Sequence, residues 1–190
     1  MAKKSSILPY KGQTTYKFKT RGISYKLPLV KVERNKYIAW LNTLGDVKLT
    51  TSSAKILAKE LKDCDVLVTL ESYGIEFAHS LATLLKHDKF VVCRIKKHSY
   101  MHKPIHEYWG PKNNVKSAVL YLDSEDAKFI KGKKVAIVDE IVGARRAMDA
   151  MEKLVKKAGG KVVKRVAMFS DEKRYSDVLE TGILPVFEKK

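Results

Sequence analysis

Two adjacent carboxylates, Asp139 and Glu140, directly follow the apolar run 135–138. A run of this kind is typical of a buried strand, and acids at its carboxyl end would project into the crevice where parallel α/β sheets bind their ligands. Two carboxylates can accept hydrogen bonds from vicinal hydroxyls, such as those of a ribose, directly or through a divalent ion. The helical pattern over 144–158 starts just after Gly143, and its unpaired N–H groups can receive a phosphate. The pattern predicts a ribose-phosphate site, against the alternative that acids at strand ends are common in α/β proteins.

A second polar segment, 94–111, is too basic and too rich in Pro and Gly to be a core element. Its histidines His98, His102 and His106 are spaced by four, which on a helix would align three imidazoles for a metal, but Pro104 argues against that helix. The segment also offers a nucleic-acid contact, with basic residues for the backbone and aromatic residues for base stacking. Those aromatic residues are Tyr100, Tyr108 and Trp109.

The elements that must position these residues alternate along the chain. Apolar runs predict buried strands at 65–70, 89–95, 117–123, 133–139 and 161–169, and helical spacing predicts helices at 54–62, 75–87 and 144–158. Alternation of strands and helices is typical of an α/β fold with a central, mostly parallel sheet flanked by helices.

The N-terminal segment has a different pattern. Residues 14–32 alternate apolar and basic positions around Arg21 and Gly22, which predicts a β-hairpin with one solvated face, and 37–42 adds another extended piece. We therefore divide a single compact chain of 190 residues into an N-terminal basic β appendage, 1–45, and an α/β core, 46–190.

The formal net charge is +17, and it is unevenly distributed. Residues 1–34 hold nine Lys and Arg against one acid, and 94–116 hold six against one. Such a field attracts polyanions, either phosphorylated small molecules or nucleic acid; the alternative is a surface that is merely solvated by lysine. The sequence has no apolar run of transmembrane length and no secretory signal, so we expect a cytoplasmic protein without a membrane partner. Cys64 and Cys93 lie in or beside apolar runs and are expected to be reduced thiols.

The stretch VAIVDEIVGARRA, 135–147, resembles the phosphoribosyl-pyrophosphate (PRPP) signature of the type I phosphoribosyltransferases. DVLVTLESYGIEFAHSLA, 65–82, is similar to the strand, pyrophosphate loop and helix of adenine phosphoribosyltransferases, and FVVCRIKKHSYMH, 90–102, to their next strand and flexible catalytic loop. The order and spacing agree over roughly 45–170. The resemblance implies the type I phosphoribosyltransferase fold with a small N-terminal β hood. It also implies transfer of a phosphoribosyl group from PRPP to a purine nitrogen with release of pyrophosphate.

The resemblance also implies roles for particular residues. It assigns catalytic roles to Asp139, Glu140 and Lys97. It assigns PRPP binding to Glu71, Ser72, Tyr73, Gly74, Arg94, Lys96, Gly143, Ala144, Arg145, Arg146 and Ala147. Mg²⁺ would enter with PRPP, with Asp139 and Glu140 as its candidate protein contacts. The basic loop would be a lid, the hood and the GILPVF segment at 182–187 would recognise the base, and the protein would be a homodimer.

Three departures from the family pattern bear on function. Ala144 and Ala147 replace the two threonines of the family's Thr-Gly-x-Thr loop, and Arg145 replaces its glycine. Tyr73 stands where adenine-specific relatives often carry a basic residue. Arg145 and Arg146 would then either hold the phosphate bidentately or fill the pocket. Two hypotheses follow: a working purine phosphoribosyltransferase, or a catalytically impaired regulator of the same fold that binds a nucleotide or nucleic acid.

Overall fold

The computed structural model describes residues 6–109 and 118–189. Its centre is an all-parallel sheet with the strand order β11-β10-β9-β5-β6. These strands are β5 (Val66–Leu70), β6 (Val91–Cys93), β9 (Lys134–Val142), β10 (Lys161–Asp171) and β11 (Leu179–Leu184). The α/β fold with a central parallel sheet, expected from the sequence, is confirmed.

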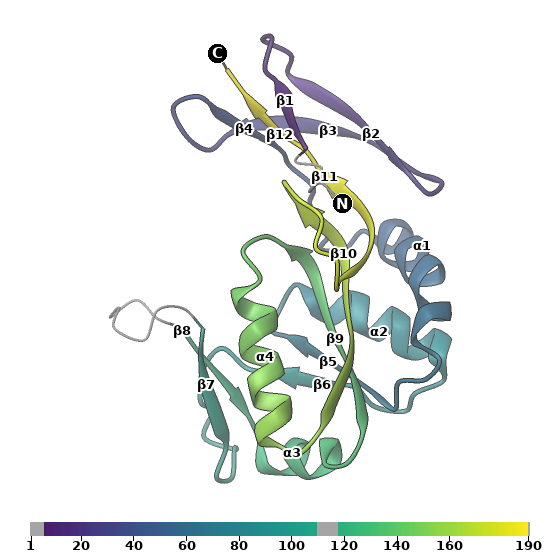
Figure 1. The fold of residues 1–190 in the computed structure, drawn as a ribbon, viewed down its shortest axis with the longest axis vertical. Coiled ribbons are helices and arrows are strands. Elements are labelled where there is room, and N and C mark those ends of the chain that lie inside the picture. Colours follow the sequence, from purple (N-terminus) through teal and green to yellow (C-terminus); the bar gives the residue numbers. More distant parts are fainter. Residues whose placement is uncertain (1–5, 110–117, 190) are drawn as a thin grey trace.

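Helices cover both faces of this sheet (Figure 1). On one face lie α1 (Val47–Leu57), its 3₁₀ continuation η1 (Ala58–Leu61) and α2 (Gly74–Leu85); on the other lies α4 (Arg146–Lys157), with the short α3 (Ser124–Ile130) near one end. The carboxylate of Asp46 accepts a hydrogen bond of 2.9 Å from the Leu49 N–H and thereby caps α1. No helix among the described residues has the length and apolar run needed to cross a membrane.

The side chains of β9 divide between two apolar clusters. Ala136 and Val138 pack on the side of α1 and α2, whereas Val135 and Ile137 pack on the side of α4. Successive side chains of a strand point to opposite faces, so Asp139 continues the α4 face and Glu140 the face of α1 and α2. The two adjacent acids therefore enter different environments.

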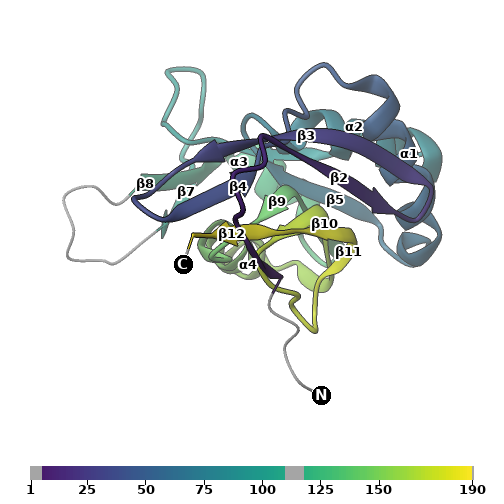
Figure 2. The same cartoon turned by 90° about the horizontal axis from the view of Figure 1, so that it is seen from above.

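The hood is a second five-stranded sheet with the order β1-β12-β4-β3-β2. Its strands are β1 (Ile7–Pro9), β2 (Thr15–Thr20), β3 (Ile23–Lys31), β4 (Lys36–Ala39) and β12 (Val186–Glu188). The hairpin expected around Arg21 and Gly22 is present, and both turn residues have positive φ, 41° and 83°. The C-terminal β12 returns to pair with β1 and β4 (Figure 2). The Phe18 ring packs edge-on against Phe169, with 5.4 Å between the ring centroids. The hood and the core sheet thus share one apolar cluster.

The strand expected at 117–123 forms, but it lies outside the parallel sheet in which we expected it. Its described part, β8 (Ala118–Leu122), does not join the parallel sheet but pairs antiparallel with β7 (Ile105–Trp109), beside α4. Only Leu120 and Leu122 of β8 are fully buried, and such alternation is typical of a half-covered antiparallel hairpin rather than a central strand. The end of segment 94–111 is therefore a strand as far as Trp109, and 110–117 lies outside the described residues.

Candidate active site at the carboxyl end of β9

A pocket of about 490 Å³ opens beyond the carboxyl ends of β5 and β9. One wall is the continuous stretch 139–147, and the opposite wall is 70–74; Ile95 and Trp109 complete the lining. A larger groove of about 590 Å³ lies between α1 and α2, but its lining includes no residue at the carboxyl end of a core strand. The strand-end pocket is where this architecture binds ligands, and it gathers most of the residues singled out in the sequence.

Asp139 is partly exposed toward the pocket, and its Oδ1 accepts a hydrogen bond of 2.8 Å from the Glu140 N–H. Burial raises the pKa of Asp139 to about 7; the hydrogen bond from Glu140 opposes this shift, and the charge of Glu140 adds to it. At neutral pH this carboxyl group lies close to its own pKa. A ligand hydroxyl or cation therefore decides whether it is ionised.

Glu140 is buried and already has a partner. The hydroxyl of Thr43, in the segment that joins the hood to α1, donates to Glu140 Oε1. Burial raises the pKa of Glu140, the Thr43 hydrogen bond lowers it, and the nearby charge of Glu76 raises it. Glu76 in turn accepts from the Gly45 N–H at 3.1 Å. Glu140 is therefore tied to the hood connection, while Asp139 has one carboxylate oxygen without a partner among the described residues.

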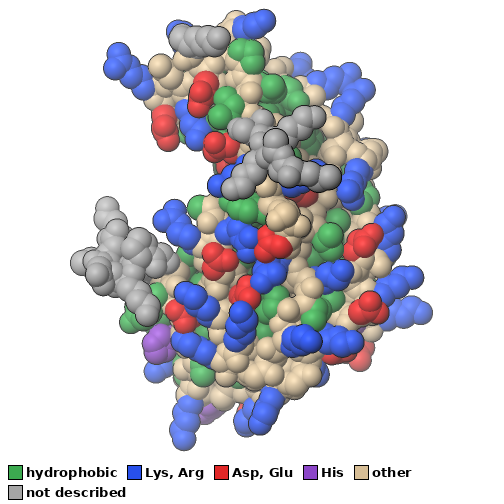
Figure 3. All heavy atoms as spheres, viewed as in Figure 1, with side chains coloured by type: hydrophobic (Ala, Val, Ile, Leu, Met, Phe, Trp, Pro, Cys, Tyr) green, Lys and Arg blue, Asp and Glu red, His purple; other side chains and the backbone are tan. Residues whose placement is uncertain are grey.

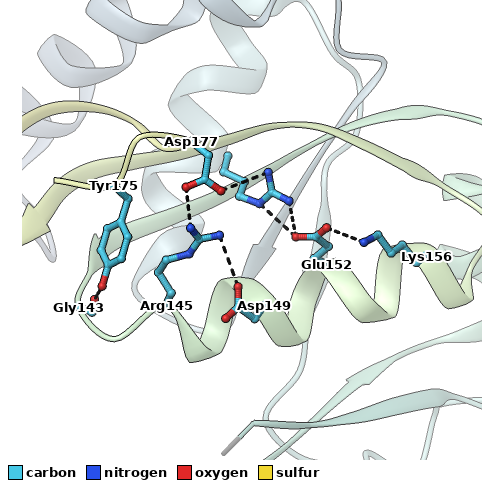
Figure 4. Close-up of polar contacts among 8 residues, drawn as sticks. Gly143, Arg145, Asp149, Glu152, Lys156, Tyr175 and Asp177 are labelled. Carbon is cyan, nitrogen blue, oxygen red and sulfur yellow. Dashed lines mark hydrogen bonds and ion pairs between the residues drawn. The ribbon is translucent and has the colours of Figure 1, made fainter. Parts of the chain in front are cut away.

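Arg145 stands just before α4 and has a positive φ of 61°. Left-handed backbone at a residue with a Cβ costs about 1–2 kcal/mol, and this is the position where the resembling signature has glycine. The guanidinium bonds Asp177 Oδ1 at 2.6 Å and lies 3.5 Å from Asp149 Oδ1 (Figure 4). The sequence left open whether Arg145 holds a phosphate or fills the pocket; in this structure its guanidinium pairs with two protein carboxylates.

The loop between β10 and β11 supplies Tyr175 and Asp177, which both contact the residues just before α4. Tyr175 OH donates to the carbonyl oxygen of Gly143, and Asp177 also approaches Arg165 at 3.6 Å (Figure 4). Arg165 pairs with Glu152 one turn further along α4. The loop 143–147 is thus fixed by Tyr175 and Asp177 from the segment after β10, and Asp177 in turn lies near Arg165 of β10.

The remaining residues of the 143–147 loop are less constrained. Ala144 and Arg146 are exposed, and both line the pocket, as do Gly143 and Ala147. No ion pair within 6–109 and 118–189 involves Arg146, so its charge remains available to a ligand.

The opposite wall contains the predicted pyrophosphate loop. Glu71 Oε1 lies 3.5 Å from Arg94 Nη2, and Glu71 Oε2 accepts from the Ile95 N–H at 3.3 Å. The peptide bond between Glu71 and Ser72 is cis. Any Cβ at Gly74 would overlap Thr69 Oγ1, so the chain needs glycine where α2 begins beside β5. Ser72 and Tyr73 are exposed at the pocket, and Tyr73 supplies no cation.

Two predicted residues lie away from this wall. Lys96 and Lys97 are exposed, and neither belongs to the pocket lining. The segment with His98, His102 and His106 is not a helix: the described residues form turns and then β7. Sequence patterns alone missed Thr43 and Asp177, because a lone Thr in a linker and a lone Asp in a loop carry no periodic signal.

An open parallel sheet with a ligand-sized pocket beyond its strand ends, beneath a β hood, defines an α/β protein with a strand-end site. Residues 47–183 match the phosphoribosyl transferase domain model. The chain therefore belongs to the phosphoribosyltransferase family.

Individual relatives agree with this assignment. The chain is 37% identical over 112 residues to an adenine phosphoribosyltransferase of Hydrogenovibrio crunogenus, a match that covers 56% of each protein and so spans about half the length of that curated relative. The fold is similar to the adenine phosphoribosyltransferase structure from Thermoanaerobacter pseudethanolicus, with a TM-score of 0.59, 21% identity, and coverage of 74% of this chain and 83% of that one. It is also similar to the Saccharomyces cerevisiae enzyme complexed with an imino-altritol bisphosphate and adenine, with a TM-score of 0.55, 19% identity, and coverage of 83% and 84%.

Asp139→Asn should change the pH dependence of stability. The folded chain holds the Asp139 proton up to about pH 7, against an ordinary pKa of 3.8, so the free energy of unfolding should fall as pH rises from about 4 to 7. In the variant the free energy of unfolding should not fall over this pH range, and the variant should be more stable than the parent at pH 8. The gain should stay below about 4 kcal/mol, since one pKa unit corresponds to about 1.4 kcal/mol and the side chain is partly exposed. Urea unfolding at pH 5 and pH 8 measures it, with exposed Asp88→Asn as the control; a variant less stable than the parent at pH 8 would contradict it.

A double-mutant cycle should reveal the coupling between Arg145 and Asp177. Arg145→Gly relieves the left-handed backbone but loses the ion pair, so we expect a net change within about 1 kcal/mol. Asp177→Asn alone should destabilise by about 1 kcal/mol, and by less than half of that in the Arg145→Gly background, because only its longer contact with Arg165 remains. Equal costs of Asp177→Asn in both backgrounds would show that the pair contributes nothing.

Proposed function

We propose that the chain binds PRPP or a nucleoside 5′-monophosphate in the strand-end pocket and, as an enzyme, transfers the phosphoribosyl group to a purine base. The observation that carries the proposal is Asp139, a carboxylate with a free oxygen at the end of a buried parallel strand, which opens into a 490 Å³ pocket beside the start of α4. Asp139 would accept a hydrogen bond from a ribose hydroxyl. The purine preference is inferred from the names of the relatives.

The phosphate would lie at the start of α4. The first-turn N–H groups of a helix have no partner within the helix, and the positive end of the helix dipole favours an anion there. Arg146 adds an exposed guanidinium at the same wall. In this proposal backbone N–H groups and Arg146 take the place of the threonine hydroxyls that Ala144 and Ala147 lack.

The donor set fits a Mg²⁺ ion that arrives with its ligand. Mg²⁺ keeps several waters and is usually held by one or two carboxylates together with substrate phosphates. Among the described residues no group of three or more His, Cys, Asp or Glu could form a protein cage, whereas Asp139 offers one free oxygen. When bound, the ion would neutralise charge on the leaving pyrophosphate. Asp139 would hold the ion, and Glu140 would lie further from it.

In the transfer step the bond from ribose C1′ to the pyrophosphate oxygen breaks, a bond from C1′ to a purine nitrogen forms, and the proton of that nitrogen passes to the pyrophosphate or to solvent. The Glu71–Gly74 wall would receive the pyrophosphate, and Arg94, which pairs with Glu71, would orient that wall. Lys96 and Lys97 would contribute only after the basic segment moves, since both lie away from the pocket lining. The hood and 182–187 would recognise the base.

A second candidate function is binding without transfer. It is favoured by the ion pair of Arg145 with Asp177, which neutralises the cation closest to the missing hydroxyls. Tyr73 likewise leaves the pyrophosphate wall with less positive charge. A regulator needs only the ribose and phosphate contacts, whereas an enzyme must also stabilise the leaving group.

Calorimetry with PRPP and Mg²⁺, and then with AMP, should detect binding that depends on Asp139. Asp139→Asn should weaken binding at least tenfold, since it removes a charge-assisted hydrogen bond worth about 1.5–3 kcal/mol. Binding to the parent should strengthen as pH rises through 7, because the ionised carboxyl group is the better acceptor.

Asp171→Asn is the matched control for this measurement. Asp171 ends the neighbouring strand β10, burial also raises its pKa, and it does not line the pocket. Equal affinities of Asp139→Asn and the parent would reject the ribose assignment. AMP formation from adenine and PRPP separates the two functions: turnover supports the enzyme, and binding without turnover supports the regulator.

Restoring the family loop should strengthen PRPP binding. The triple change Ala144→Thr, Arg145→Gly and Ala147→Thr returns two hydroxyls and removes a guanidinium that is already held by Asp177. We expect at least a tenfold gain in affinity, because each hydroxyl bond to a charged phosphate contributes about 1.5–3 kcal/mol. The variant with both threonines and Arg145 retained separates the hydroxyl effect from the backbone effect. An unchanged affinity in both variants would mean that this loop does not hold the phosphate.

A further inference from the structure

The outer face of the hood hairpin carries a cluster of lysines that the strand-end pocket does not use. In the β2–β3 register Lys17 lies directly opposite Lys26, and Lys19 lies opposite Ser24. All four are exposed, while Phe18 and Leu27 point to the other face and are buried. We call this face, with Lys17, Lys19 and Lys26, the hood lysine face.

An aromatic side chain borders the hood lysine face. The Trp40 N–H donates to the carbonyl oxygen of Pro28 at 2.9 Å, which continues the β3–β4 register and puts both residues on the outer side. Trp40 is 52% exposed, so its side chain is not part of the buried core. A cationic surface thus adjoins an indole ring that is open to stacking.

The hood lysine face is unfavourable for the isolated protein. Like charges directly opposite on antiparallel strands destabilise the pair. No ion pair in the described parts of the chain involves Lys17, Lys19 or Lys26, so no acid within 6–109 and 118–189 pairs with these lysines to offset the repulsion. Lys and Arg side chains outnumber acids over the whole molecule, and the hood at the top of Figure 3 carries several of them.

We propose that the hood lysine face binds single-stranded nucleic acid. The three lysines would contact successive phosphates, and Trp40 would stack on a base, the combination by which proteins bind single strands without strong sequence preference. An exposed sheet surface fits a splayed strand, whereas a duplex hides its base faces. This binding surface is separate from the strand-end pocket and does not depend on its ligand.

A second lysine cluster is stabilised within the protein itself. Lys55, Lys59, Lys62 and Lys86 line a cleft of about 400 Å³ at the carboxyl ends of α1, η1 and α2. Cations at these helix ends are stabilised by the helix dipoles. This cluster therefore provides a control with the same charge at a different place.

Fluorescence anisotropy with labelled U12 and dT12 tests the proposal on the full chain. Lys17→Gln, Lys19→Gln and Lys26→Gln together should weaken U12 binding at least tenfold and reduce the slope of log K against log salt by about 2, since each phosphate contact on a single strand contributes about 0.7. Lys59→Gln, Lys62→Gln and Lys86→Gln remove the same charge and should change affinity less than threefold. Equal losses in the two triple variants would mean that binding follows net charge alone and would overturn the proposal.

Two further measurements test the stacking by Trp40 and the repulsion between the lysines. U12 should quench tryptophan fluorescence, and Trp40→Leu should abolish that quenching although Trp109 remains. The hood triple variant should also unfold at an equal or higher temperature, because it removes the repulsion between Lys17 and Lys26. Three results would overturn the proposal: a lower unfolding midpoint of the hood triple variant, tighter binding of a 12-base-pair duplex than of U12, or a change in Trp40 fluorescence that follows protein concentration rather than U12 concentration. The last result would show that Trp40 contacts a second copy of the chain.

A preference for one oligonucleotide identifies the source of the strand. Tighter binding of U12 than of both dT12 and dU12 indicates a contact with the RNA 2′-hydroxyl, since dU12 lacks only that group, and equal binding indicates recognition by phosphate and base faces alone. Either result supports the proposal if the hood triple variant weakens the binding of that strand at least tenfold, and overturns it if the variant binds as the parent does.

Discussion

The alternation of side chains along β9 is the constraint on which the site depends. A parallel strand buried on both faces sends successive residues to opposite sides, so two adjacent acids at its end have different neighbours. Both line the pocket, but Asp139 lies on the side of α4, whereas Glu140 lies on the side of α2 and accepts a hydrogen bond from Thr43. Burial raises the pKa of both groups, but only Glu140 receives a side-chain hydrogen bond in return. One acid is thereby held in place, and the other remains responsive to what occupies the pocket.

The connection between hood and core follows from the same alternation. Because Glu140 points toward α2 and the hood, it meets Thr43 at the point where the chain leaves β4 and approaches α1. The nearby hydrogen bonds from Gly45 to Glu76 and from Tyr25 to Asp46 hold this short connection at the end that precedes α1. Together with the packing of Phe18 on Phe169, they fix the hood above the strand ends. The hood is therefore mechanically linked to an acid of the site.

The start of α4 shows how a loop can keep its backbone shape after losing its usual residue types. Arg145 adopts the left-handed conformation that glycine adopts at no steric cost. Its ion pairs with Asp177 and Asp149, and the Tyr175 hydrogen bond to Gly143, supply interactions that offset this cost. The same interactions neutralise the guanidinium. The charge that looks available in the sequence is therefore largely used within the protein, and Arg146 is the cation that remains exposed.

The sequence by itself determined the fold class and the position of the site. The apolar runs within 65–70 and 133–139 are uninterrupted enough to be buried strands in any packing arrangement, and the acids after Val138 must then lie at a strand end. The hairpin around Arg21 and Gly22 was also predictable, since its alternation and turn are local. Only the tertiary structure decided that 118–122 pairs with β7 rather than joining the parallel sheet, because a short apolar run can form either kind of strand. Contacts between residues far apart in the chain were equally beyond the sequence. Thr43 reaches Glu140 and Asp177 reaches Arg145 only after the sheet, the hood and α4 have assembled, because hydrogen bonds and ion pairs depend on distances that local sequence patterns do not contain.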